Sequence, residues 1–165
     1  MKRIHLKRQI GFFLFRVWSW AKRMHGEVQT ENLRRNGSEG SVGGDVVLAH
    51  AENISIGKNS YVNGGMLAAS PNAEISIGSN CLISYGVHMR TDMHRHDLFS
   101  ETPMIDQGLD EKSIRIGDNV WIGFGAQIMS GVSVGSNSII AAGAVVTKNV
   151  PPYEVWGGIP ARRLR

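Results

Sequence analysis

The histidines that could act as a general base gather around one irregular stretch of the chain. His94 and His96 lie within residues 92–113, DMHRHDLFSETPMIDQGLDEKS, and His88 precedes them. Histidine suits this role because its unperturbed pKa lies close to neutral pH. A long stretch without a repeat costs ordering entropy and adds little core, so we expect it to be functional. A base held at a rigid edge could deprotonate an alcohol, although a loop histidine taken alone is more often a solvated side chain.

The scaffold that must position these histidines is a repeat of six residues. From Ile116 to Val150, position one is a branched aliphatic residue, position four is Gly or Asn, and position five is small. Branched aliphatic side chains suit short strands, and a column of Gly and Asn marks corners with positive φ. Regular alternation of strand and corner predicts a solenoid, and three sides to a turn predict a coil of eighteen residues. The columns are Ile116, Ile122, Ile128, Val134, Ile140 and Val146; Asn119, Gly125, Gly131, Asn137, Gly143 and Asn149; and Val120, Ala126, Val132, Ser138, Ala144 and Val150.

The same repeat occurs less regularly before residues 92–113. Units start at Ile56 and again at Ile77, but the register slips by three residues across residues 68–75. A bulge at a corner would absorb this slip. The predicted organisation is an N-terminal helix (1–25), a linker (26–45), a β-helix (46–150) interrupted by the loop 92–113, and a C-terminal tail (151–165).

Length and composition are those of a single domain with a thin core. The 165 residues include 20 Gly and only 7% aromatic residues, which agrees with many corners and a narrow interior. Cys81 is the only cysteine, so an internal disulfide is excluded and a reducing compartment is favoured. We find no cleavable signal peptide, and the apolar run from Ile10 to Ala21 is short and contains Arg16. The predicted location is therefore cytoplasmic.

The net charge of +4 is concentrated at the N-terminus. Residues 1–35 carry nine Lys or Arg against two Glu, which gives +7, and the remaining residues carry nine basic and twelve acidic side chains, which gives −3. An apolar stripe within residues 1–25 predicts either an amphipathic anchor on an anionic membrane surface or a helix packed on the solenoid or a neighbouring subunit. No recognised motif supports nucleic-acid binding. The stripe comprises Ile10, Phe13, Leu14, Val17, Ala21 and Met24.

The repeat resembles that of the hexapeptide-repeat acyltransferases, whose fold is a left-handed parallel β-helix. Over about residues 56–165 the chain is similar to the galactoside, maltose and polysaccharide O-acetyltransferases of that family. The likeness rests on Val-Trp-Ile-Gly at 120–123, Val-Thr-Lys at 146–148 and Gly-Ile-Pro-Ala-Arg-Arg-Leu-Arg at 158–165. The expected fold class is all-β, a left-handed parallel β-helix with an N-terminal amphipathic α-helix and an extended tail. The resemblance also implies a homotrimer with active sites between subunits.

The resemblance implies that His94, which ends Thr91-Asp92-Met93-His94, is the catalytic base, with His96 as the alternative. Asp92 or Asp97 could orient its imidazole. The expected acceptor contacts are Asp92 and Asn63, whose neighbour Gly64 holds the aligned position. Charge supports the basic members of the expected acetyl-CoA site, because CoA carries several phosphate charges and Arg suits phosphate geometry. That site comprises Trp121, Phe124 (through its backbone), Ala142, Thr147, Lys148, Arg162 and Arg165.

The implied reaction is direct transfer of the acetyl group of acetyl-CoA to a saccharide hydroxyl, in bacterial surface polysaccharide or lipopolysaccharide synthesis. No covalent intermediate is expected, because the loop pairs no Cys or Ser with a base and Cys81 falls in the inward position-five column. No metal is expected either. The basic N-terminus suggests work at the inner face of the cytoplasmic membrane, on a lipid-linked saccharide or a nucleotide sugar.

Three alternatives stay open at this point. The first is an amino-sugar N-acetyltransferase, since such enzymes also use hexapeptide repeats. The second is a zinc protein similar to γ-class carbonic anhydrases, although the close spacing of His94 and His96 does not match the widely spaced ligands of that family. The third is a non-enzymatic scaffold attached to a membrane.

Overall fold

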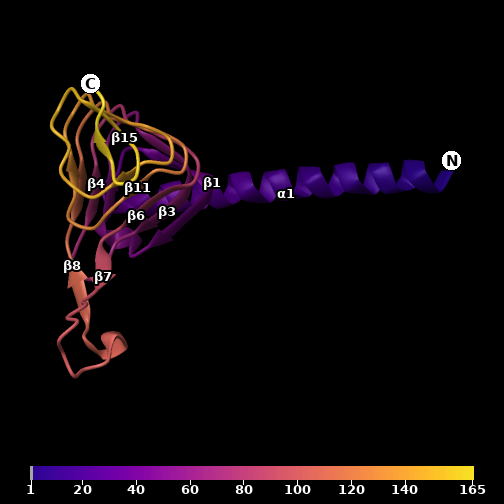
Figure 1. The fold of residues 1–165 in the computed structure, drawn as a ribbon. Helices are drawn as coiled ribbons and strands as arrows, with labels where there is room; N and C mark the ends of the chain where they lie inside the picture. Colours follow the sequence, from indigo (N-terminus) through magenta and orange to yellow (C-terminus); the bar gives the residue numbers. More distant parts are fainter. Residues whose placement is uncertain (1) are drawn as a thin grey trace.

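The fold is a parallel β-solenoid with one long helix at its N-terminal end (Figure 1). The computed structural model describes the backbone of residues 2–165 and the side chains from residue 9 onward. The elements in chain order are α1 (Lys2–Arg35), β1 (Ser41–Ala49), the 3-10 helix η1 (Ala51–Asn53), β2 (Ile54–Ile56), β3 (Tyr61–Ala68), β4 (Ile75–Ile77), β5 (Leu82–Ile83), β6 (Val87–Arg90), β7 (Asp92–His94), the 3-10 helix η2 (Met104–Asp106), β8 (Leu109–Glu111), β9 (Ile114–Ile116), β10 (Trp121–Ile122), β11 (Gln127–Ile128), β12 (Ser133–Val134), β13 (Ile139–Ile140), β14 (Val145–Val146), β15 (Val155–Gly157) and β16 (Arg162–Arg163).

Three faces of strands wind around the solenoid axis. Face 1 holds the first half of β3 with β5, β10 and β13; face 2 holds the second half of β3 with β6, β11 and β14; face 3 holds β2, β4, β9 and β12. Pairing within each face is parallel. In the C-terminal coils the partners are eighteen residues apart, because Trp121 pairs with Ile139 and Gln127 pairs with Val145. The expected coil of eighteen residues is therefore confirmed.

The interior is built from the columns that the repeat predicted. All position-one and position-five residues of Ile116–Val150 are buried, none more than 4% exposed. The corner residues take positive φ, for example 55° at Asn119, a conformation that only Gly and Asn adopt readily. Asn149 is the exception: it lacks positive φ, and its side-chain oxygen accepts a hydrogen bond from the Ser133 N–H at 2.9 Å. Its corner is the last one, where Pro151 ends the winding.

Two insertions leave the solenoid at the corner between faces 2 and 3. Ile54 pairs with Ile75, an offset of 21 residues, and Ile75 pairs with Ile114, an offset of 39. The first offset is three residues longer than a plain coil and contains the register slip expected across residues 68–75; we call residues 70–74 the insertion. The second contains the antiparallel hairpin β7–β8, which projects from the solenoid (Figure 1); we call residues 92–111 the arm.

Helix α1 extends ten residues beyond the expected helix 1–25, so the expected linker 26–45 is wrong in its first part and carries β1 at its end. The polar stretch 26–35 remains helical because one of its sides packs on β1. Leu33 is fully buried, and the Thr30 hydroxyl both donates to the Val42 carbonyl at 3.4 Å and accepts from the Val42 N–H at 3.1 Å. Tertiary contacts of this kind stabilise a helix more than its intrinsic propensity does.

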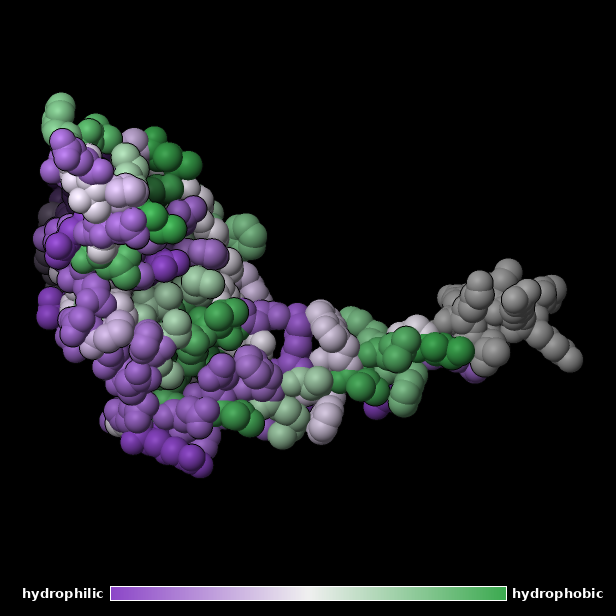
Figure 2. All heavy atoms as spheres, turned by 90° about the horizontal axis from the view of Figure 1, so that it is seen from below, coloured by the Kyte–Doolittle hydropathy of each residue, from purple (hydrophilic) through white to green (hydrophobic). Residues whose placement is uncertain are grey.

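The outer half of α1 projects from the solenoid with its apolar side chains uncovered (Figures 1 and 2). Phe13 is 64% exposed and Val17 is 44% exposed. Val17 lies nine residues from Gly26, which is half a turn around a helix, and Gly26 is buried against β1. The apolar stripe therefore points away from β1, and the interpretation that it packs on its own solenoid is wrong. In the described part of the chain, no helix is long and apolar enough to cross a bilayer.

Candidate active site

The expected base, His94, lies at the start of the arm. Strand β6 ends face 2 at Arg90, the chain turns the corner at the buried Thr91, and β7 then leaves the solenoid. His94 pairs with Leu109 across the hairpin and is exposed. The fold thus places an accessible imidazole three residues beyond a rigid corner. His88 is also exposed but stays on face 2, where it pairs with Gln127.

The two carboxylates expected near His94 are engaged elsewhere. Asp92 accepts two hydrogen bonds from the Arg90 guanidinium, at 2.7 and 2.9 Å, and this contact holds the pKa of the Asp92 carboxyl below its ordinary value. Asp97 accepts a hydrogen bond from the Phe99 N–H at 2.9 Å. Neither carboxylate bonds the His94 ring in the described residues. The role of Asp92 that the geometry shows is therefore to hold Arg90, and its expected contact with the acceptor stays a prediction.

The expected CoA residues of the middle coils lie along two edges of face 2. Phe124 and Ala142 lie one above the other at the corner between faces 1 and 2, since the Gly143 N–H donates to the Phe124 carbonyl at 2.8 Å. Trp121 is 51% exposed on face 1 beside this edge, and Phe124 is 67% exposed. A side chain at Gly123 would approach the Ala142 nitrogen to 2.6 Å, so the coils can stack here only with a glycine. The edge combines exposed aromatic rings with a close-packed backbone.

The opposite edge of face 2 carries the arm and the expected cationic residue Lys148. The Ser130 hydroxyl donates to the Thr91 carbonyl at 2.6 Å, and the pairing of β11 with β14 sets Lys148 one coil above Ser130. Thr147 and Lys148 are both exposed. Thr91, Ser130 and Lys148 thus mark three successive coils along one corner. Strands stack about 4.8 Å apart, so Lys148 lies about 10 Å along this corner from the root of the arm.

The C-terminal tail folds back over the last coil. Strand β16 runs antiparallel to β15, with Gly157 opposite Arg162, and the Ala161 N–H donates to the Val145 carbonyl at 2.8 Å. Arg163 pairs with Glu154 at 3.2 Å. Among the side chains from residue 9 onward, Lys148, Arg162 and Arg165 have no ion-pair partner, and all three are exposed. Their positive charge is available to an anionic ligand.

Asn63, the expected acceptor contact, lies far from His94 within one chain. It precedes the stretch of β3 that crosses face 2, whereas the arm leaves beyond the far end of β6. The four residues of β6 span about 13 Å, so face 2 separates the two side chains. One chain brings His94 and Lys148 to one edge and Asn63, Phe124 and Ala142 to the other.

Cys81 is core, as its place in the inward column indicates. Its thiol is fully buried and donates to the Gly117 carbonyl at 3.1 Å, and burial raises the pKa of that thiol. In the part of the chain whose side chains are described, no three His, Cys, Asp or Glu groups converge as a metal site requires.

Three residues that contact the arm were missed in the sequence. Ser70 and Asn72 lie in the insertion and bond residues Thr91 and Glu111 at the base of the arm, and Ser130 bonds Thr91. The slip in register marked the place of the insertion, but the sequence carries no signal for its partners, which lie 21 to 39 residues away.

Comparison with known proteins shows which families and structures this chain is similar to. The family model described as bacterial transferase hexapeptide (six repeats) matches residues 113–148. The galactoside O-acetyltransferase of Escherichia coli (strain K12) is 37% identical over 122 residues, which are 73% of this chain and 57% of that relative. The crystal structure of a maltose O-acetyltransferase from Clostridium difficile 630 has 32% identity and a TM-score of 0.66, over 81% of this chain and 71% of the other.

A third relative has been solved with a ligand. It is a hexapeptide-repeat containing acetyltransferase from Vibrio cholerae O1 biovar eltor, complexed with acetyl-CoA. It has 30% identity and a TM-score of 0.67, over 84% of this chain and 76% of the other.

The chain belongs to the hexapeptide-repeat acyltransferases. The expected fold class is confirmed as a parallel β-solenoid with an N-terminal helix, by the strand topology and by these solved relatives. The chain spans little more than half the length of the curated relatives that it matches first, 57% of the Escherichia coli protein.

Proposed function

We propose that this protein transfers the acetyl group of acetyl-CoA to a hydroxyl group of a saccharide, with His94 as general base. His94 takes the proton of the acceptor hydroxyl while that oxygen forms a bond to the thioester carbonyl carbon. The carbon–sulfur bond then breaks, and the proton passes from His94 to the departing CoA thiolate. The observation that carries this proposal is the exposed His94 at the same corner of the solenoid as Lys148.

The binding of acetyl-CoA follows from the free cations and the close-packed edge. Lys148, Arg162 and Arg165 offer positive charge to the phosphates of CoA. Ala142 is exposed and has only a methyl side chain, which leaves room for the narrow pantetheine arm, and the buried Gly123 keeps the coils close together beneath it. Trp121, Phe124 and Thr147 complete the set that the family motif assigns to this ligand.

The complete site forms between copies of the chain in a homotrimer. The support for this part is the separation of the two edges of face 2, because a second copy can bring its Phe124 edge against the His94 edge of the first. The exposed outward residues of face 1 also suit association: Tyr61, Leu82 and Trp121 pair in register and are 40 to 51% exposed.

The test of the reaction is release of free CoA thiol from acetyl-CoA with a panel of acceptors. The panel contains galactosides, maltose, an amino sugar and nucleotide sugars, and the mass shift of the product identifies the acetylated group. His94→Ala is expected to lower kcat by about 10²- to 10⁴-fold, the usual contribution of a general base, while His96→Ala retains most activity. Full activity of His94→Ala would remove His94 from this role, and acetylation of the amino group alone would favour N-transfer.

The acceptor is proposed to be a precursor of surface polysaccharide or lipopolysaccharide, met at the inner face of the cytoplasmic membrane. The support is α1, whose apolar stripe points away from the solenoid and whose flanking residues are basic. Side chains such as Phe13 and Trp20 (60% exposed) suit the interface of a bilayer, and each Lys or Arg near an anionic surface adds about 1 kcal/mol. Self-association of three such helices is less favourable, because residues 1–35 carry +7 in each copy.

Vesicle flotation of the full chain tests this placement. Vesicles of phosphatidylcholine with phosphatidylglycerol are expected to carry the protein, and vesicles of phosphatidylcholine alone to carry much less. Phe13→Glu should abolish flotation, whereas the control Leu98→Glu, at an apolar residue of the arm that is also largely exposed, should not. Equal flotation with both kinds of vesicle, or a change of oligomeric state caused by Phe13→Glu without vesicles, would contradict the proposed membrane contact.

A further inference from the structure

We propose that the insertion (residues 70–74) and Ser130 form a clamp that fixes the arm and thereby positions His94. The insertion and the arm leave the solenoid at the same corner in adjacent coils, and they are bonded to each other. This inference rests on the proposed role of His94 as the base, and the residues of the clamp are positioning residues.

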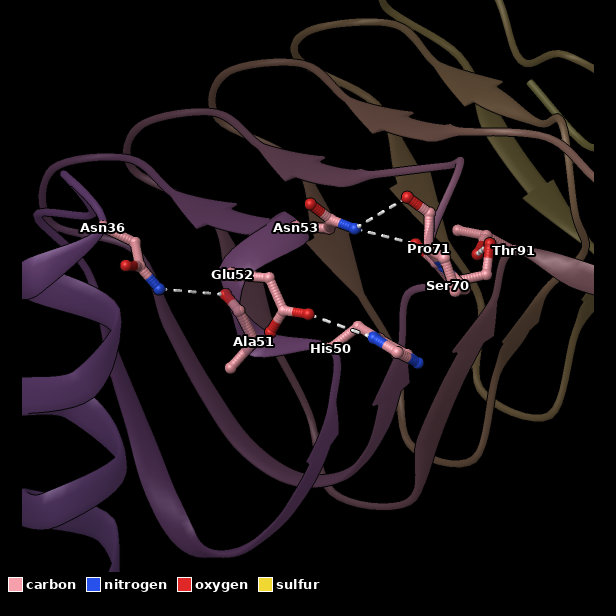
Figure 3. A network of polar contacts seen from close by, with 8 residues as sticks. All are labelled: Asn36, His50, Ala51, Glu52, Asn53, Ser70, Pro71 and Thr91. Carbon is pink, nitrogen blue, oxygen red and sulfur yellow. Dashed lines mark hydrogen bonds and ion pairs between the residues drawn. The ribbon is translucent and has the colours of Figure 1, made fainter.

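Thr91 is the centre of the clamp. Its side chain is fully buried, and its hydroxyl donates to the Ser70 hydroxyl, also buried, at 2.9 Å (Figure 3). Its backbone N–H donates to the Ala68 carbonyl at 3.0 Å, and its carbonyl accepts from Ser130 at 2.6 Å. Every polar group of Thr91 is thus satisfied by a neighbouring coil. The direction in which the chain leaves the corner is therefore set before the arm begins.

Ser130 ties the two ends of the arm together. Besides its bond to Thr91, its hydroxyl lies 3.4 Å from the Lys112 carbonyl, and the Lys112 N–H donates to the Thr91 carbonyl at 2.9 Å. The chain enters the arm after Thr91 and returns at Lys112, so one hydroxyl contacts both stalks. This arrangement resists opening of the hairpin at its base.

The insertion holds the returning stalk as well. The Asn72 side-chain amide donates to the Glu111 carboxylate at 2.5 Å, and the Glu74 N–H donates to the Ser113 hydroxyl at 3.1 Å. The insertion is itself anchored, because the Asn53 side-chain amide donates to the Ser70 carbonyl at 2.8 Å (Figure 3). The insertion therefore absorbs the three-residue slip in register and also holds the base of the arm through hydrogen bonds.

The clamp matters because, apart from the ion pair of Arg90 with Asp92, no other contact described above joins the arm to the solenoid. The arm contributes no residue to the buried core, and its tip is open: Phe99 is 97% exposed and Ile105 is 80% exposed. A displacement of about 1 Å at a reacting group can cost about a hundredfold in rate. His94 is only three residues from Thr91, so any movement of the chain at Thr91 displaces the imidazole of His94.

The experiment compares Thr91→Val, which keeps the shape and removes the hydroxyl, with Thr91→Ser, which keeps the hydroxyl. Ser130→Ala is the second variant. The control is Ser138→Ala, at a fully buried serine whose hydroxyl donates to the Pro151 carbonyl at 2.9 Å, away from the arm. Thr91→Val and Ser130→Ala are expected to lower kcat about tenfold or more with the KM for acetyl-CoA unchanged. Thr91→Ser should restore most of kcat, and the control should keep it.

Hydrogen exchange of the amides of residues 92–111 separates this inference from the proposed reaction. The arm is expected to exchange about fivefold faster in Thr91→Val and Ser130→Ala than in the parent protein and the control, because a buried hydrogen bond is lost. Unchanged exchange in both variants would overturn the clamp whatever the role of His94. An equal loss of kcat in Thr91→Ser and Thr91→Val would also overturn it. Full turnover by His94→Ala would instead overturn the proposed base and leave the exchange result standing.

Discussion

The side-chain amide of Asn72 donates a hydrogen bond of 2.5 Å to the carboxylate of Glu111, 39 residues further along the chain. This contact joins the insertion of one coil to the arm of the next. Hydrogen bonds from Asn72 and then Ser70 hold the pKa of the Glu111 carboxyl below its ordinary value, since they favour the charged form.

The first prediction concerns the pH dependence of the arm. A carboxyl with a depressed pKa in the folded protein stabilises the structure above its unfolded pKa of about 4.3, and this contribution is lost as the pH falls through the folded pKa. Amides of residues 92–111, corrected for intrinsic exchange, should therefore lose protection on acidification below about pH 4. Glu111→Gln should remove most of this dependence. If the pH dependence of amide protection is the same in Glu111→Gln as in the parent protein, a group other than Glu111 causes it.

The second prediction concerns the phosphates of CoA. Lys148→Ala and Arg162→Ala should each raise the KM for acetyl-CoA about tenfold, because a charged hydrogen bond contributes about 1.5–3 kcal/mol. With acetyl-pantetheine, which lacks the nucleotide and its phosphates, parent and variants should have similar KM values. The control is Arg163→Ala, since Arg163 is already paired with Glu154 at 3.2 Å. A similar rise in KM for both donors would show that these residues do not bind phosphate.

The third prediction concerns the reactivity of Cys81. Only the thiolate reacts with iodoacetamide, and the Cys81 thiol is buried with a raised pKa. The native protein at pH 8 should be alkylated far more slowly than the protein in concentrated guanidinium chloride, as measured by intact mass. Stoichiometric labelling of the native protein within minutes would contradict the burial of this side chain.

The fourth prediction concerns the attachment of α1. A methyl group at Gly44 would lie 1.9 Å from the Lys22 carbonyl oxygen, a backbone atom that cannot give way without moving the helix. Gly44→Ala should destabilise the helix–β1 contact by about 1–3 kcal/mol. Limited proteolysis between α1 and β1 should then become faster. Gly11→Ala is the matched control, because nothing lies within 4 Å of its added methyl group, and it should leave this junction unchanged. Equal proteolysis of Gly44→Ala and the parent would contradict the packing described.

The solenoid could be predicted from the sequence because each of its coils is determined by residues close together in the chain. The buried aliphatic residue at Ile122 and the positive φ at Gly125 are local requirements of one unit. Six successive units repeat these requirements, so the pattern can be recognised in the sequence. Asn149 departs from its column because its surroundings are those of the end of the winding, which no repeat describes.

The end of α1 and the clamp could not be predicted in the same way. Residues 26–35 look like a polar connector in the sequence, because the burial of Leu33 in the core and the bond of Thr30 to β1 exist only in the folded chain. Ser70 and Ser130 are ordinary corner serines in the sequence. The insertion brings Ser70 to Thr91, and the pairing of β6 with β11 across the arm sets Ser130 over the same residue. The separation of Asn63 from His94 likewise follows from the winding, which the alignment of motifs does not contain.

The hydrogen bond between the Lys112 N–H and the Thr91 carbonyl has one more consequence. The two ends of the arm lie side by side, so the polypeptide between them can be exchanged for another without a change in the path of any coil. The part of the arm beyond His94 is in this sense exchangeable: residues 95–108 can differ in sequence or length while β7, β8 and the coils of the solenoid keep their positions.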